Sequence, residues 1–382
     1  MKRIAVLLML VLVLPALISG VSGEGLDVPV KSAVLMDVAT GTVLYEKNAH
    51  EALAPASVTK VMTMLLIMEA IDSGTLGYGD IVTTSEAAAR KGGSQVYLKV
   101  GEQMRVEEML KSIAVSSAND CACAMAEHLS GSEEAFVERM NQKAKELSME
   151  NTHFVNCTGL DDSPEAKNHK TSAYDVALMS RELLGKHPDI RKFTTIWMDT
   201  IRNGTFGLSN TNKLVRFYPG ATGLKTGFTS GAGYCLSASA RRENLELIAV
   251  TMGAESSKIR NAACKAMLDY GFAGFALVCP SLEESIQVPV RLGTEAGVDV
   301  ALQGDASVLI PKAQKAGLTT KLTLEEFCTA PVEKGARLGT LTVRSGEETL
   351  LEVPLVAARE VKRKTFRDWL LLVLRKASMA KT

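Results

Sequence analysis

The hydrophobic and polar positions of the chain follow a mixed pattern over its first two hundred residues. Two strand-like runs, at 32–37 and 43–46, are joined by Ala-Thr-Gly and predict a β-hairpin. The segment 58–71 is apolar with few polar positions, which predicts a buried helix. Residues 106–185 then read as mainly helical.

After Gly223 the pattern changes to short strands. Runs of strand-forming residues separated by turn residues lie at 224–229, 233–240 and 245–252, and a helical pattern follows at about 258–270. Strands, helices, strands and a final helix in this order predict an α+β domain, in which one antiparallel sheet carries helices on its faces.

The residues after Gly271 follow a third pattern of hydrophobic and polar positions. Short alternating runs punctuated by Gly and Pro extend over 286–357 and predict a small all-β domain. Nothing in this stretch resembles a chemical site, so any activity is expected in the first domain.

The N-terminus has the layout of a secretory signal peptide. Lys2 and Arg3 precede an uncharged apolar run, 4–18, and small residues follow as far as Gly23. The run is shorter than the roughly 20 residues that a membrane-spanning helix needs. We expect an exported protein cleaved after Gly23, and an uncleaved membrane anchor is the alternative.

The C-terminal tail predicts a basic amphipathic helix. Phe366, Trp369, Leu370 and Val373 follow helical spacing, and Lys and Arg residues bracket them. Such a helix can lie in the interface of an anionic membrane. The alternative is an ordinary helix docked on the body of the protein. We expect the helix to bind a membrane, because both flanks of the apolar run are basic and the chain is expected to be exported.

Composition narrows the classes of function. The 382 residues are 46% hydrophobic and 23% charged, with 43 basic and 43 acidic side chains. Zero net charge argues against a generally basic nucleic-acid binder. Residues 361–382 nevertheless carry a net charge of +6 and residues 24–360 a net charge of −8. The seven cysteines form no disulfide framework and no zinc-binding spacing, so we expect small buried apolar residues and no metal or cofactor.

Ser57 and Lys60 are the first candidates for chemistry. A spacing of three places both on one helix face, at the start of the predicted buried helix. Serine needs a neighbouring base to act as a nucleophile, and a buried lysine can be that base because burial lowers its pKa. The alternative is a helix cap followed by a surface lysine, and this pair alone does not decide between the two.

Two further short motifs indicate a function only when their order along the chain is considered. Ser117-Ala-Asn119 follows Ser57 by 60 residues, at a predicted junction between helices, and Lys225-Thr226-Gly227 lies on a predicted strand. Alone, the first reads as a helix cap and the second as an exposed strand. Together, Ser-x-x-Lys, Ser-x-Asn and Lys-Thr-Gly form the motif set of penicillin-binding proteins and serine β-lactamases.

With these motifs the chain resembles the low-molecular-mass penicillin-binding proteins, which are serine-type D-alanyl-D-alanine carboxypeptidases. Flanking stretches such as Gly159-Leu-Asp161 and His169-Lys-Thr-Ser-Ala-Tyr-Asp175 also resemble that family. The resemblance implies a penicillin-binding/β-lactamase-like catalytic domain. It divides the chain into a signal peptide at 1–23, a catalytic domain at 24–273, a β-rich domain at 274–360 and an amphipathic membrane-anchor helix at 361–382.

The resemblance also implies roles for the motif residues. Ser57 would be the acylated nucleophile and Lys60 its base, while Ser117 and Asn119 would assist proton transfer and substrate placement. Lys225, Thr226 and Gly227 would bind the substrate's terminal region. The backbone N–H groups of Ser57 and Phe228 would form the oxyanion hole. Arg260 falls where the family places an arginine for the terminal carboxylate, with Lys258 as a rival.

The expected reaction is removal of the C-terminal D-alanine from the peptidoglycan pentapeptide, with β-lactams as inhibitors, at the outer face of the cytoplasmic membrane. Three alternative functions are compatible with these motifs. A β-lactamase of the same fold is disfavoured because no Glu-x-x-x-Asn motif lies between the second and third elements. A D,D-endopeptidase stays open. An inactive scaffold is disfavoured because it would not need an intact nucleophile, base and Lys-Thr-Gly.

Overall fold

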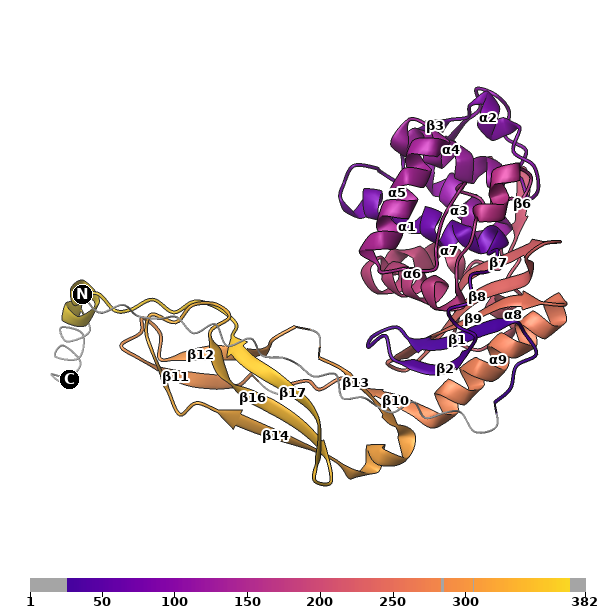
Figure 1. Cartoon of the computed structure of the whole chain (residues 1–382). Coiled ribbons are helices and arrows are strands. Elements are labelled where there is room, and N and C mark those ends of the chain that lie inside the picture. The colour runs from indigo at the N-terminus through magenta and orange to yellow at the C-terminus, as the bar shows by residue number, and fades with distance from the viewer. Residues whose placement is uncertain (1–25, 283–284, 305, 372–382) are drawn as a thin grey trace, which may run out of the picture.

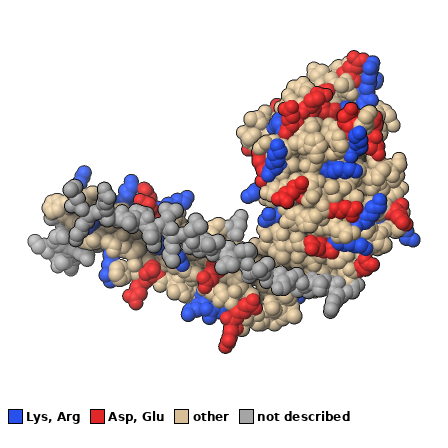
Figure 2. Space-filling view, viewed as in Figure 1, with Lys and Arg blue, Asp and Glu red and all other residues tan. Residues whose placement is uncertain are grey.

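The computed structural model describes residues 26–282, 285–304 and 306–371. The signal peptide expected at 1–23 lies outside these residues. Figure 1 shows a larger domain of helices and sheet, and a smaller β domain that extends away from it. Basic and acidic side chains are interspersed over the visible face of the larger domain (Figure 2).

The larger domain is built on an antiparallel sheet of five strands in the order β2-β1-β9-β8-β7. Their bounds are Ser32–Asp37 (β1), Val43–Lys47 (β2), Ala221–Thr229 (β7), Gly233–Arg242 (β8) and Leu245–Ala254 (β9). Successive residues of the central strands enter different cores: Val34 and Val250 belong to one, Leu35 and Ala249 to the other. Both faces of the sheet are therefore covered, as side-chain alternation requires.

Helices cover one face and a single long helix covers the other (Figure 1). The first group comprises α1 (Lys60–Asp72), α3 (Val106–Ser116), α4 (Asn119–Ser130), α5 (Glu133–Glu146) and α6 (Ala173–Lys186), with α9 (Ser257–Gly274) on the opposite face. In α1, ten of the thirteen residues are buried. The buried helix expected over 58–71 is therefore present, but a 3₁₀ turn, η1 (Ala56–Thr59), precedes it.

Short elements connect this framework. They are β3 (Ile81–Thr83), α2 (Glu86–Ala89), β4 (Gln103–Arg105), η2 (Pro164–Asn168), η3 (Pro188–Ile190), α7 (Arg191–Thr194), β5 (Met198–Ile201), β6 (Phe206–Ser209) and α8 (Leu214–Phe217). Several helices begin at a serine that accepts a backbone N–H, among them α5 at Ser132 and α6 at Ser172.

The smaller domain contains a six-stranded sheet in the order β14-β16-β17-β12-β11-β15. Its strands are β11 (Gln287–Arg291), β12 (Gly297–Leu302), β14 (Leu318–Leu324), β15 (Cys328–Thr329), β16 (Arg337–Ser345) and β17 (Glu348–Ala357). A separate apolar cluster, which includes Val298, Leu341 and Leu355, lies within it. The α+β class with an additional all-β domain is thus confirmed.

The two domains are joined by a strand pair. Strand β10 (Phe275–Val278), which follows α9 directly, pairs antiparallel with β13 (Val308–Pro311), from within the smaller domain's sequence. Leu309 of β13 belongs to the apolar cluster beneath α9, and Lys312 Nζ donates a hydrogen bond to the Phe272 carbonyl at 2.7 Å. These contacts cross the division expected at 273/274.

The tail separates from the β domain later than expected. Val361 is 1% exposed and exchanges backbone hydrogen bonds with Val332, and the Lys364 N–H donates to the Leu292 carbonyl at 2.9 Å. A helical turn follows at 366–371, where Phe366 is 84% exposed and Trp369 is 40% exposed. Val373 lies outside the described residues. Among those described, no helix has both the length and the apolar character needed to cross a membrane.

The cysteines follow the sequence expectation only in part. All seven are free thiols, and Cys121, Cys123, Cys157, Cys235 and Cys264 are buried. Cys279 is exposed and Cys328 is half-buried, so the expectation of buried apolar residues is wrong for these two. Their positions beside the short strands of the smaller domain leave their side chains partly open to solvent.

Candidate active site

Ser57 and Lys60 face each other at the junction of η1 and α1. Lys60 Nζ lies 3.0 Å from Ser57 Oγ and donates a second hydrogen bond to the Thr158 carbonyl at 2.9 Å. Lys60 is fully buried, whereas Ser57 is half-buried. Burial lowers the pKa of Lys60 to about 7, and the negative groups nearest to it oppose this only weakly. The ammonium therefore loses its proton near neutral pH, and the resulting amine can accept one from the Ser57 hydroxyl.

The turn before Ser57 is held by a chain of hydrogen bonds. Ala56 has a φ of +48°, and its carbonyl accepts a bond from Thr59 Oγ1 at 2.8 Å. Thr59 Oγ1 is also 2.8 Å from His169 Nε2. Because the Val155 N–H donates to His169 Nδ1 at 3.1 Å, the neutral ring carries its hydrogen on Nε2 and donates it to Thr59.

This chain fixes the backbone that presents Ser57. Burial, with the charges of nearby cations, lowers the pKa of His169 to about 4, so the ring stays neutral at physiological pH. Gly159 packs on the same turn at a φ of +80°, and a Cβ there would lie 1.8 Å from the Ala56 carbonyl oxygen. Only glycine permits this approach.

Ser117 and Asn119 lie between two helices, as the sequence predicts. Ser117 ends α3 at a φ of +63°, and Asn119 is the first residue of α4. The Asn119 amide nitrogen donates to the Gly92 carbonyl at 2.7 Å. Within the part of the chain that the structure describes, buried Ser117 Oγ and Asn119 Oδ1 have no hydrogen-bond partner. Two orphaned polar atoms at this junction are suited to groups of a bound substrate.

Lys225, Thr226 and Gly227 lie on β7, the edge strand of the sheet. A Cβ on Gly227 would lie 2.6 Å from the Pro55 carbonyl oxygen and 3.1 Å from the Ser57 nitrogen, so the strand runs directly against η1. This places the Lys-Thr-Gly strand beside the nucleophile's backbone N–H. An edge strand of this kind can pair with the backbone of an extended peptide.

The cation of Lys225 is less accessible than the sequence suggests. Its side chain is buried, and Nζ donates to the Thr226 carbonyl at 2.9 Å. Burial, followed by the charges of Lys60 and Arg260, holds the pKa of Lys225 well below its usual value. Thr226 Oγ1 is 2.6 Å from Thr211 Oγ1. The groups that this strand offers to a substrate are therefore the Thr226 hydroxyl and the backbone, and not a free ammonium.

Arg260 lies in the first turn of α9 and is 5% exposed, whereas its rival Lys258 is exposed. The Arg260 guanidinium lies 5.9 Å from the centre of the Tyr234 ring, and that ring stacks on Phe228 at 4.3 Å. Lys60 and Arg260 both lie close enough to Lys225 for a charge on either to lower its pKa. Because burial lowers the pKa of both lysines, Arg260 is the cation here that favours a ligand with a carboxylate.

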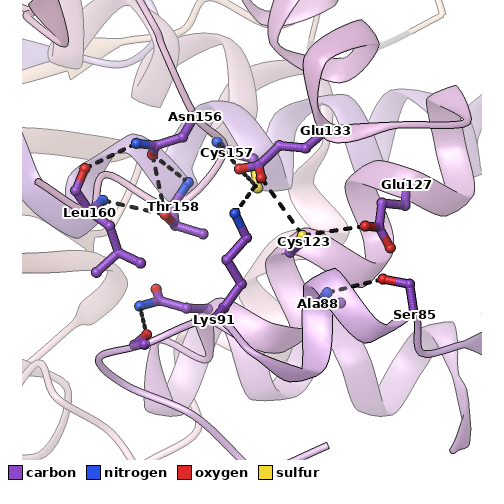
Figure 3. Close-up of polar contacts among 12 residues, drawn as sticks. Ser85, Ala88, Lys91, Cys123, Glu127, Glu133, Asn156, Cys157, Thr158 and Leu160 are labelled. Atoms are coloured by element: carbon purple, nitrogen blue, oxygen red, sulfur yellow. Dashed lines mark hydrogen bonds and ion pairs between the residues drawn. The ribbon is translucent and has the colours of Figure 1, made fainter. Parts of the chain in front are cut away.

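Several contributors carry no sequence signal that points to a site. They include the backbone carbonyls of Thr158 and Gly92, which receive the Lys60 and Asn119 side chains (Figure 3 shows Thr158). Thr59 lies within the Ser-x-x-Lys motif and His169 begins a stretch that resembles the family, but only the fold shows that the two side chains bond to each other. Among the described residues, no group of three or more His, Cys, Asp or Glu side chains could hold a metal ion.

Comparison with known proteins gives consistent results. Residues 20–256 match the family model described as D-alanyl-D-alanine carboxypeptidase, and residues 283–363 match the C-terminal domain of penicillin-binding protein 5. D-alanyl-D-alanine carboxypeptidase DacF of Bacillus subtilis is 46% identical over 346 residues, which cover 89% of this chain and 88% of that protein. DacC of Escherichia coli is 34% identical over 91% of this chain and 88% of its own length.

Solved structures agree with these sequence matches. The crystal structure of penicillin-binding protein 5 from Haemophilus influenzae superposes with a TM-score of 0.72 at 29% identity, over 88% of this chain and 99% of that one. Penicillin-binding protein D2 of Listeria monocytogenes, in its ampicillin-bound form, matches 65% of this chain and 99% of its own with a TM-score of 0.59 at 30% identity.

Proposed function

The chain belongs to the family of penicillin-binding D-alanyl-D-alanine carboxypeptidases and is a D,D-carboxypeptidase, and from this premise we propose that Ser57 is its nucleophile and Lys60 its general base. The observation that carries the proposal is the 3.0 Å separation between Lys60 Nζ and Ser57 Oγ, with Lys60 fully buried and its pKa lowered to about 7. A base with a pKa near the working pH is the most effective one.

The acylation step follows from these atoms. The Lys60 amine takes the Ser57 proton, and Oγ attacks the carbonyl carbon between the two terminal D-alanines. The backbone N–H groups of Ser57 and Phe228 receive the negative oxygen of the tetrahedral intermediate. The C–N bond then breaks, and the nitrogen of the departing D-alanine takes the proton that Lys60 had accepted, relayed by Ser117. Water releases the shortened peptide from Ser57 in a second step that uses the same base.

Substrate placement is assigned to the remaining residues. The stem peptide extends along the free edge of β7, with the Asn119 amide and the backbone of Lys225, Thr226 and Gly227 as its polar partners. The terminal carboxylate points toward Arg260 at the start of α9. Burial of Arg260 and exposure of Lys258 support this choice, because a charge-assisted bond is stronger in a site that excludes water.

Replacing the nucleophile tests the proposal directly. Ser57→Ala is expected to abolish both covalent labelling by a fluorescent penicillin and release of D-alanine from a peptide ending in D-Ala-D-Ala. The fold should be unchanged, because Ser57 is half-buried and alanine fills less space. Circular dichroism and the thermal midpoint serve as controls. Labelling of the variant at the wild-type rate would refute the assignment.

The comparisons support the carboxypeptidase more than the endopeptidase. The relatives named above are carboxypeptidases over nearly their whole length, whereas a relative named D-alanyl-D-alanine endopeptidase, from Pseudomonas aeruginosa, matches only 54% of this chain. A β-lactam would acylate Ser57 as the peptide does.

We also propose that the protein is exported and that its tail binds the outer face of the cytoplasmic membrane. Support comes from the exposed apolar residues Phe366, Leu370 and Leu371, which are not packed on the described body of the protein. Lys362, Arg363 and Lys364 precede them and can attract anionic lipid head groups.

A further inference from the structure

Outside the residues assigned to catalysis, a half-buried carboxylate lies where α5 begins. Glu133 is the first residue of α5, and its side chain is 15% exposed. Figure 3 shows that the side chains of Lys91, Cys123 and Cys157 converge on it. Glu133 Oε1 accepts bonds from both the backbone N–H and the Sγ of Cys157, each at 3.1 Å, and Oε2 forms an ion pair with Lys91.

Two of the partners of Glu133, Cys157 and Lys91, belong to different segments of the chain. In each segment, the backbone carbonyl of the next residue accepts a hydrogen bond from a side chain of the proposed site. Cys157 precedes Thr158, whose carbonyl accepts a hydrogen bond from Lys60 Nζ. Lys91 precedes Gly92, whose carbonyl accepts one from the Asn119 amide. The carboxylate therefore joins the segment that holds the base to the segment that holds the substrate-binding amide.

Other hydrogen bonds hold the remaining backbone groups of the Cys157 segment. The Cys157 carbonyl accepts a bond from Thr63 Oγ1 of α1 at 2.7 Å. The Asn156 side chain accepts the Thr158 and Gly159 N–H groups at 3.1 and 2.7 Å, which closes a tight turn (Figure 3). Among the described residues, Glu133 is the acceptor for the remaining Cys157 N–H.

From these contacts we propose that Glu133 is a positioning residue for the reaction, which holds the Thr158 and Gly92 carbonyls in register so that Lys60 and Asn119 keep their orientations. The inference rests on the proposed roles of Lys60 and Asn119. When Lys60 is a neutral amine, a hydrogen bond to the Thr158 carbonyl leaves its lone pair directed at the Ser57 hydroxyl. Displacement of that carbonyl would remove both this orientation and an acceptor that favours the ammonium form.

Several charged and titratable groups surround Lys60 and Glu133, and a test of Glu133 must take them into account. Lys60 faces Asp120 of α4, Cys157, Lys225 of β7 and His169. Glu133 faces Lys91, Cys123 and Cys157, and Cys123 also contacts Glu127. Burial opposes the ionised form of Glu133, but the bond and charge of Lys91 outweigh it and lower the pKa of the carboxyl.

The experiment measures the rate of covalent labelling by a fluorescent penicillin against pH, in the full chain and in three variants. Glu133→Gln keeps the side chain's size but loses its charge, and Glu133→Asp keeps the charge but is too short to reach both partners. Glu134→Gln is the matched control, because Glu134 is exposed on the same turn of α5. The thermal midpoint is measured for each.

We expect Glu133→Gln and Glu133→Asp to label about tenfold more slowly at the high-pH plateau, as for loss of one well-aligned hydrogen bond. In both, the midpoint of the acid limb should fall below the wild-type value, because Lys60 loses an acceptor that favours its charged form. Glu134→Gln should match the wild type. If Glu133→Gln does not fold, Glu133→Asp decides alone.

A purely structural role predicts a different outcome. The thermal midpoint would then fall while the plateau rate and the acid limb stayed at their wild-type values, and this would overturn the inference. If the wild type and Glu134→Gln also failed to label, the assignments of Ser57 and Lys60 would be wrong, and the role of Glu133 would fall with them.

Discussion

At the scale of single residues, the burial that makes Lys60 a base also lowers the free energy of unfolding. Its side chain is buried completely, between Ser57 and the Thr158 carbonyl, and burial lowers its pKa from 10.5 to about 7. A lowered pKa of this size corresponds to a folding penalty on the order of 4–5 kcal/mol at pH values below the folded pKa. The same burial makes Lys60 available as a base near neutral pH.

Lys60→Met should therefore abolish acylation by penicillin and stabilise the protein. Loss of two hydrogen bonds, at about 1 kcal/mol each, leaves an expected gain of about 2–3 kcal/mol. Because the folded pKa is lowered, the wild type gains stability as pH rises from about 7 to 10.5. The advantage of Lys60→Met should be full below the folded pKa and shrink as pH rises. Above the unfolded pKa the wild type should be the more stable protein, because the penalty on Lys60 is gone and only the loss of the two hydrogen bonds remains. Denaturant unfolding at several pH values measures it, and an advantage that grew with pH would contradict the argument.

Arg260 allows a second test at this scale. Arg260→Ala should reduce turnover of peptides with a free terminal carboxylate far more than turnover of the amidated peptides. A charge-assisted hydrogen bond is worth about 1.5–3 kcal/mol, which is roughly ten- to a hundredfold in kcat/KM. Lys258→Ala, in the same turn of α9 but exposed, is the control. Equal losses on both substrates would show that Arg260 does not bind the carboxylate.

At the scale of elements, the site depends on how closely three backbones approach. The turn η1, the strand β7 and the loop at Gly159 meet at Ala56 and Ser57, and glycine is required where each partner touches the turn. Lys60 and Asn119 reach carbonyls in two further loops. The nucleophile is thus oriented by contacts between elements far apart in sequence more than by its own helix.

Gly159→Ala tests this dependence. Its Cβ would collide with the Ala56 carbonyl, so the loop must move and carry the Thr158 carbonyl away from Lys60. Labelling by penicillin should slow by on the order of a hundredfold, about 3 kcal/mol in the barrier. Gly74→Ala is the control: Gly74 also has a positive φ, of +74°, but a Cβ there meets nothing within 4 Å. It should lose about 1 kcal/mol of stability and label normally.

Much of this architecture could be predicted from the sequence. The hairpin, the buried helix after Ser57, the three strands after Gly223 and most strands of the smaller domain follow from periodicity and turn residues. Periodicity does not mark strand β14, because its residues, Leu-Thr-Thr-Lys-Leu-Thr-Leu, are nearly all exposed and lack a buried face. The carbonyls that orient Lys60 and Asn119 could not be predicted, because a backbone carbonyl has no residue signature and its contact is set by tertiary packing.

At the scale of the whole molecule, the tail begins later than the sequence suggests. A division at residue 360 would remove Val361, which is buried and pairs with Val332 in the β domain. A chain that ends after Thr365 keeps Val361 and the Lys364–Leu292 bond. It removes the exposed apolar residues that begin at Phe366. Deletion experiments on the tail should therefore stop there.

We expect a protein that ends after Thr365 to fold and to hydrolyse small peptides normally, because every proposed catalytic residue lies before Phe272. Its partitioning onto anionic vesicles should fall on the order of a hundredfold, since Phe366, Trp369 and Leu370 are lost. Binding of the full chain should weaken with salt without vanishing, because salt screens its Lys and Arg residues and not its apolar ones. Sedimentation with vesicles measures both. Equal partitioning of the two proteins would exclude the anchor.

The β10–β13 pair limits where the two domains can be separated or exchanged at the level of the gene. Strand β13 arrives from the smaller domain, and its Leu309 packs beneath α9. A gene cut directly after β10 would give a catalytic unit with an unpaired strand and an apolar gap, which is prone to aggregate. Exchange of C-terminal domains among relatives would therefore succeed only when the incoming domain supplies its own version of β13. A recombination breakpoint between β10 and β13 therefore carries a cost in solubility.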